Sequence, residues 1–184
     1  PIPLAETSSI LGERLFSERL LKEFPEQEIS MLVEDLEGVY ATIFRQALFA
    51  RFEIKAHDMI ARGATTEELL DMYLDLLKKQ FGPDVEVPEE FRFEILRIPH
   101  IFRTPFYVPG YPFGMLLAYS IYQRYRDEGP AFAEKAVQFI SKGGSQRPAE
   151  AVAELGMDIN SQQFWHGAFD PIRAMLKRLE DITK

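Results

Sequence analysis

The side chains best suited to chemistry in this sequence include three histidines, and their spacing excludes one familiar zinc motif. His57, His100 and His166 lie far apart in the chain. The motif H-E-x-x-H instead places two imidazoles one helical turn apart to hold zinc, with its glutamate as general base. The chain has no cysteine, which excludes thiolate catalysis, and it has no G-x-S-x-G nucleophile motif. It therefore contains no complete catalytic motif of these types.

A proline-rich aromatic segment holds further candidates. Residues 99–112 combine several prolines with the side chains of His100, Tyr107 and Tyr111. Prolines at this density predict a loop, and loops on a rigid scaffold often carry functional sites. An imidazole and phenols can donate hydrogen bonds to a developing oxyanion. The same side chains could instead cap a helix or pack with their polar ends exposed, so both interpretations stay open.

The elements that must position these side chains are helices. Apolar residues recur with a period near 3.6 along most of the chain, so we predict an all-α fold of about seven to eight helices. The longest predicted helix, near residues 26–61, would span roughly 50 Å and should lean against a larger neighbour. Thr65 and Glu68 form the pattern of a capping box before the next helix. The segment 113–127 is apolar nearly all round, which predicts a buried helix.

Length, charge and composition bear on the number of domains, the kinds of partner and the location of the protein. The 184 residues are expected to form one helical domain, 1–184. The formal net charge of −8 argues against a nucleic-acid partner, since phosphate binding needs a basic face. No apolar run of roughly 18 residues is present, so no membrane span is predicted. The cysteine-free composition is compatible with a cytoplasmic location.

Four motifs, in order along the whole chain, resemble the oligoendopeptidase F family, a group of zinc metallopeptidases related to thimet oligopeptidase. The first is AETSSILGE at 5–13, and the second is His100 followed by FYVPGY at 106–111. The third is QFISKGGSQRP at 138–148, and the fourth is LGMDI at 155–159, followed by Phe164 and Trp165. The sequence departs from the family at Pro109, where members often carry another tyrosine.

The resemblance implies a zincin-like oligopeptidase that hydrolyses short peptides with one zinc ion. It implies that Glu6 is the third zinc ligand and that Glu13 supports the metal site from the same helical face. It also implies that His100, Tyr107 and Tyr111 line the substrate cleft. The zinc-binding histidines and the general base of the family would lie upstream of residue 1. We therefore expect a C-terminal part that needs the upstream part of the same peptidase and is inactive alone.

Other interpretations of the same residues remain open. A carboxylate such as Glu6 in the first turn of a helix is favourable through the helix dipole alone, and Glu13 could be an exposed ion-pair partner. A non-catalytic helical binding module, with the aromatic segment as its groove, is the alternative function. The chain starts at Pro1 rather than at methionine, which suggests a fragment. Apolar surface left uncovered by missing sequence would favour a homodimer.

Overall fold

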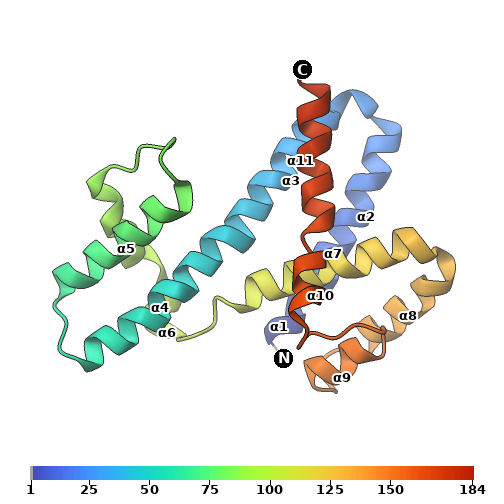
Figure 1. Ribbon diagram of the computed structural model, residues 1–184. Helices are drawn as coiled ribbons and strands as arrows, with labels where there is room; N and C mark the ends of the chain where they lie inside the picture. The colour runs from blue at the N-terminus through green and yellow to red at the C-terminus, as the bar shows by residue number, and fades with distance from the viewer. Residues whose placement is uncertain (1) are drawn as a thin grey trace. The chain divides into compact units, whose positions relative to one another are not determined.

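The chain is entirely helical over the part that its computed structural model describes, residues 2–184, with side chains from Leu4 onward (Figure 1). The predicted all-α class is confirmed, and no strand occurs within those residues. Their contacts divide the chain into two compact units. The terminal unit combines the N-terminal segment up to Ile43 with Gly110–Lys184, and the inserted unit is Phe44–Pro109. None of the helices in the described part is long and apolar enough to cross a membrane.

The terminal unit is organised around α7, the predicted buried helix. Its helices are α1 (Ile2–Ala5), α2 (Thr7–Glu23), α3 (Glu28–Val39), α7 (Gly110–Glu128), α8 (Pro130–Ser141), α9 (Pro148–Ala153), α10 (Gln162–Gly167) and α11 (Asp170–Ile182). Helix α7 packs against α1, α2, α8 and α11, and α3 packs against α11. Leu117 and Ile121 of α7 are completely buried. An all-round apolar sequence thus becomes a helix that packs against four others of this unit.

The inserted unit is a smaller helical cluster. Its elements are α4 (Arg45–Ala61), α5 (Thr66–Phe81), the 3₁₀ helix η3 (Glu89–Arg97) and α6 (Pro99–Arg103). Helix α5 packs against both α4 and η3. The capping box predicted at the start of α5 is present: the Glu68 amide donates to Thr65 Oγ1 at 3.3 Å, and the Thr65 amide donates to Glu68 Oε2 at 2.7 Å. This reciprocal pair fixes where α5 begins.

The long helix predicted near residues 26–61 is present but not uniform. A short 3₁₀ turn, η1 (Pro25–Gln27), leads into α3, and a π-helical segment, η2 (Tyr40–Phe44), joins α3 to α4. The two compact units divide within this π-helical segment, between Ile43 and Phe44. Periodicity did not predict the π-helical segment, because one extra residue in a turn leaves the apolar pattern on either side intact.

Two local predictions need correction, one for the aromatic segment and one for the segment before it. We expected a loop over residues 99–112, but α6 covers Pro99–Arg103 and α7 starts at Gly110, so the loop is only residues 104–109. Pro99 occupies the first turn of α6, where the missing amide hydrogen costs nothing. Apolar spacing after Pro88 likewise predicts a helix, and that segment forms the 3₁₀ helix η3, which ends before Pro99.

Candidate functional site

Glu6 lies at the junction of α1 and α2, as the residue before the first turn of α2. Its carbonyl accepts hydrogen bonds from the Ile10 amide at 3.1 Å and from Ser9 Oγ at 3.0 Å, which closes the first turn. Its side chain is half-buried and makes no hydrogen bond or ion pair with another residue of the described part. The next residue, Thr7, is fully buried, and its hydroxyl likewise has no partner there. Neither polar side chain is therefore occupied by a partner among the described residues.

Glu13 lies two helical turns after Glu6 in α2 and is exposed. It lines a pocket of about 500 Å³ formed by α2, α3 and α7, together with Arg14, Asp35 and Tyr119. Arg14 forms an ion pair with Asp35, and its guanidinium carbon lies 5.6 Å from the centre of the Tyr119 ring. Sequence reasoning singled out Glu13 but missed this neighbouring arginine–tyrosine arrangement.

The electrostatics of this pocket keep the Tyr119 phenol protonated. Burial is the largest influence and raises the pKa of Tyr119 to about 12. Asp35 and Glu13 push this pKa in the same direction, while Arg14 opposes the shift. Tyr119 is therefore a neutral hydrogen-bonding group at ordinary pH rather than a base.

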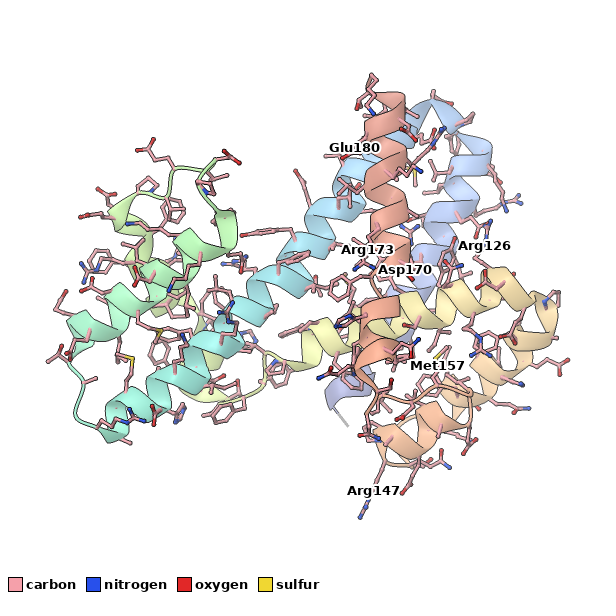
Figure 2. All side chains as sticks on the ribbon, viewed as in Figure 1. Arg126, Arg147, Met157, Asp170, Arg173 and Glu180 are labelled. Carbon is pink, nitrogen blue, oxygen red and sulfur yellow. The ribbon has the colours of Figure 1, made fainter. Side chains whose placement is uncertain are left out.

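A second polar cluster holds the far end of α2 against α7. Tyr122 donates a hydrogen bond to Glu18 at 3.0 Å, and Arg126, labelled in Figure 2, forms an ion pair with the same carboxylate. Lys22 adds a third contact to Glu18 at 2.9 Å. Burial tends to raise the pKa of Glu18, but the hydrogen bonds from Lys22 and Tyr122 outweigh it, so the pKa is lowered. This cluster fixes α2, the helix that begins after Glu6.

The other predicted site residues lie in both units. His100, in α6, and Tyr107, in the loop, both belong to the inserted unit, and their rings stack with centroids 5.5 Å apart and an interplanar angle of 21°. Tyr111 lies in the first turn of α7 in the terminal unit and is half-buried. The structure therefore brings His100 and Tyr107 together.

The loop that carries Tyr107 is held by a residue that sequence reasoning missed. Glu53, in α4, is 1% exposed, and its Oε1 accepts a hydrogen bond from the Phe106 amide at 2.8 Å. Phe106 has a positive φ of 58°. The available sequence signal was a carboxylate within the apolar stripe of α4, between Phe52 and Ala56. The two remaining histidines, His57 and His166, are exposed.

A metal ion needs several donor side chains close together. Within it, no three side chains among His, Asp and Glu converge in a way that could hold a cation. The half-buried Glu6 carboxylate, which has no partner there, fits one donor position of a zinc site. The remaining donors of such a site would have to come from outside this set of residues.

Solved structures share this fold. The crystal structure of oligoendopeptidase-F from Enterococcus faecium matches with a TM-score of 0.88 and 30% identity, covering 100% of this chain and 36% of that chain. The crystal structure of a putative peptidase from Chlamydophila abortus matches with a TM-score of 0.86, also at 30% identity, covering 98% of this chain and 31% of that chain. The fold is therefore that of the helical part of an oligoendopeptidase F-like peptidase.

A family model and curated relatives agree on the family. The model of peptidase family M3 matches residues 1–171, and the chain belongs to this family. An oligoendopeptidase F homolog of Borreliella burgdorferi is 34% identical over 98% of this chain and 30% of its own length. Oligopeptidase PepF of Bacillus subtilis is 33% identical over 97% of this chain and 26% of its own length. The chain thus spans less than a third of the length of these relatives.

Proposed function

We propose that this chain is the C-terminal part of the catalytic domain of a zinc-dependent oligoendopeptidase that hydrolyses short peptides. The observation that carries the proposal is the family M3 match over residues 1–171, which includes Glu6, whose carboxylate has no partner among the described residues. The matches to the relatives named oligoendopeptidase F homolog and oligopeptidase PepF extend over nearly all of this chain. The upstream part of the same peptidase is the partner that the proposal requires, and we place the protein in the cytoplasm.

Glu6 would hold the zinc ion as its third protein ligand, and Glu13 would support the metal site from the same helix. A bound zinc ion would supply an activated water molecule and a polarised scissile carbonyl. The helix of Glu6 is fixed by the Glu18 cluster and by the packing of α2 on α7. A rigid helix suits a ligand position because metal sites need their donors held to within a fraction of an ångström.

His100, Tyr107 and Tyr111 would form part of the peptide cleft in this proposal. Their ring N–H and O–H groups would donate hydrogen bonds to the carbonyl oxygen as negative charge develops on it. The stacking of Tyr107 on His100 restricts the orientation of both rings. Tyr111, at the start of a well-packed helix, would be a second fixed phenol.

The test is to join this chain to the upstream segment of its own gene and compare the product with the chain alone. We expect peptide hydrolysis and zinc binding only from the joined protein, since one carboxylate cannot hold a catalytic zinc ion. Glu6→Gln in the joined protein should lower both zinc affinity and activity, by at least roughly 100-fold, and Glu13→Gln by about 10-fold. Glu26→Gln, at an exposed glutamate outside α2, is the matched control and should change neither.

Two outcomes would count against the proposal. Hydrolysis by the 184-residue chain alone would contradict the need for upstream donors. A joined protein that binds peptides, but neither binds zinc nor cleaves a peptide bond, would favour the alternative function, a non-catalytic helical binding module.

A further inference from the structure

Glu53 is an unusual residue for its position in α4. Its neighbours on the buried face are Phe49, Phe52 and Ala56, and its own side chain is 1% exposed. Burying a carboxylate among apolar side chains is costly unless the group is hydrogen-bonded. Its one hydrogen bond to the rest of the described chain is the 2.8 Å contact from the Phe106 amide to Oε1, and Oε2 has no partner there.

The backbone at Phe106 explains why such a bond would be needed. Phe106 is the one non-glycine residue of the described part with positive φ, at 58°. This left-handed conformation is unfavourable for a residue with a bulky side chain. The hydrogen bond to Glu53 Oε1 satisfies the Phe106 amide in this conformation. The bond thus stabilises a backbone conformation that phenylalanine alone would avoid.

The left-handed residue sets the course of the loop. The Thr104 amide donates to the His100 carbonyl at 3.0 Å, and the Tyr107 amide donates to the Thr104 carbonyl at 3.2 Å, so the chain turns between α6 and Tyr107. The Phe106 ring lies 5.0 Å from the ring of His57, and the Tyr107 ring stacks on His100. These contacts depend on the direction that the backbone takes at Phe106.

Among the described residues, the surroundings of Glu53 are mostly apolar, and His57 is the ionisable neighbour that lines the same pocket. The carboxylate lines a mostly apolar pocket of about 260 Å³ together with residues such as Ile95, Leu96 and Phe102. No ion pair involves Glu53 within the described residues. The loop amide is therefore the group that offsets the burial of this carboxylate, and the carboxylate in turn holds the loop.

We propose that Glu53 is a positioning residue: it accepts the Phe106 amide, fixes the loop 104–109, and so holds Tyr107 on His100 in the orientation that the peptide cleft uses. The final step, from loop to cleft, rests on the function proposed above. Glu53 itself is not expected to touch substrate or to transfer a proton.

The first experiment measures the loop directly, in the 184-residue chain and without any activity. Glu53→Met removes the acceptor at similar side-chain length, whereas Glu53→Gln keeps an acceptor oxygen and removes only the charge. We expect hydrogen exchange at residues 104–108 to rise about tenfold in Glu53→Met, as for the loss of an ordinary hydrogen bond, and to change little in Glu53→Gln. Exchange in α5 serves as the internal reference and should stay constant.

Unchanged exchange of the loop in a folded Glu53→Met chain would overturn the proposal. Should Glu53→Met unfold the chain, Glu53→Asp gives the same comparison, because it keeps the charge and shortens the reach by one methylene group. Phe106→Asn adds an independent check, since asparagine tolerates the left-handed conformation far better than phenylalanine. In the Glu53→Met background it should restore part of the protection, and the absence of any restoration would contradict a role through Phe106.

The second experiment uses the joined peptidase described above. Glu53→Met should lower kcat about 10- to 100-fold through misplacement of Tyr107, with KM changed less than about threefold. Glu53→Gln should keep most of the activity and the same pH profile as the unmodified protein. If Glu53→Gln lost as much activity as Glu53→Met, the activity would depend on the charge of Glu53 rather than on its acceptor oxygen. That result would overturn the positioning role. An inactive joined protein with an unmodified Glu53 would refute the proposed function alone, because the exchange experiment still tests the loop.

Discussion

Arg14 lies over the faces of two tyrosine rings of α7, 5.6 Å from the centre of the Tyr119 ring and 5.5 Å from that of Tyr122. Together with the ion pair to Asp35, these contacts link α2 to both α3 and α7. Burial is the largest single influence and works to lower the pKa of Arg14, but the charge and hydrogen bond of Asp35 together with the two tyrosines outweigh it, and the pKa is raised. The residue is therefore a permanently charged cross-link beside the pocket that Glu13 lines.

The raised pKa of Tyr119 predicts a specific loss of stability at high pH. The folded chain holds the phenol proton up to about pH 12, whereas the unfolded chain releases it near 10.0. The free energy of unfolding should therefore be independent of this group below about pH 10 and should fall as pH rises toward 12. Urea unfolding of the chain and of Tyr119→Phe across this range measures the difference. The unmodified chain should have the steeper decline, by up to about 1.4 kcal/mol per pH unit; equal slopes would contradict the assignment.

At the residue scale, the candidate site residues remain predictions, and their contacts could not be read from the sequence. Glu6, His100 and Tyr107 were chosen from motif order, and the structure pairs the last two by stacking. Glu53 could not be assigned, because its role depends on an amide 53 residues away in sequence. Tertiary hydrogen bonds of this kind leave no periodic trace in a single sequence.

At the scale of the element, the capping box at α5 is a prediction that the structure confirms and that can be tested further. Thr65→Ala removes the hydroxyl that accepts the Glu68 amide, and an N-cap substitution of this kind costs about 1 kcal/mol. We expect faster hydrogen exchange in the first turn of α5, while the last turn changes less. Glu86→Ala is the control, because Glu86 is exposed and lies in the loop between α5 and η3. It should leave the exchange of α5 unchanged.

The 3₁₀ helix η3 is longer than such helices usually are, and tertiary contacts account for it. Glu94 accepts a hydrogen bond from Tyr73 at 2.6 Å and pairs with Arg45 at 2.6 Å, which ties η3 to both α5 and α4. Glu94→Ala should destabilise the inserted unit by about 2 kcal/mol, since hydrogen bonds to charged groups are lost. Urea unfolding followed by circular dichroism measures this.

Glu90→Gln, an exposed residue of the same 3₁₀ helix, is the matched control for Glu94→Ala. A Glu94→Ala chain as stable as the control would show that η3 does not depend on this contact. The sequence predicts a helix here but not its type, because the apolar spacings of α and 3₁₀ helices are similar over so short a segment.

At the scale of the whole molecule, the chain leaves many large apolar side chains exposed. Phe16 of α2 is 63% exposed, Phe102 of α6 is 62% exposed and Ile54 of α4 is 61% exposed. Since the chain spans less than a third of the curated relatives it matches, we propose that sequence outside it covers part of this surface. The isolated chain should then self-associate.

Sedimentation velocity across a range of concentrations tests this proposal. We expect a concentration-dependent dimer, weakened by Phe16→Glu, and a monomer once the upstream segment is joined. The control is Glu26→Gln, which leaves the apolar surface untouched. A single monomeric species at high concentration would contradict the proposal.

The terminal unit is built from two stretches of sequence separated by the inserted unit, and this order matters during synthesis. A ribosome adds roughly 5–20 residues per second, so α2 and α3 emerge several seconds before α7, the helix on which their unit is built. The inserted unit is contiguous and can complete its own contacts in that interval. Helices α2 and α3 would meanwhile have their apolar faces uncovered, because α7 has not yet been made.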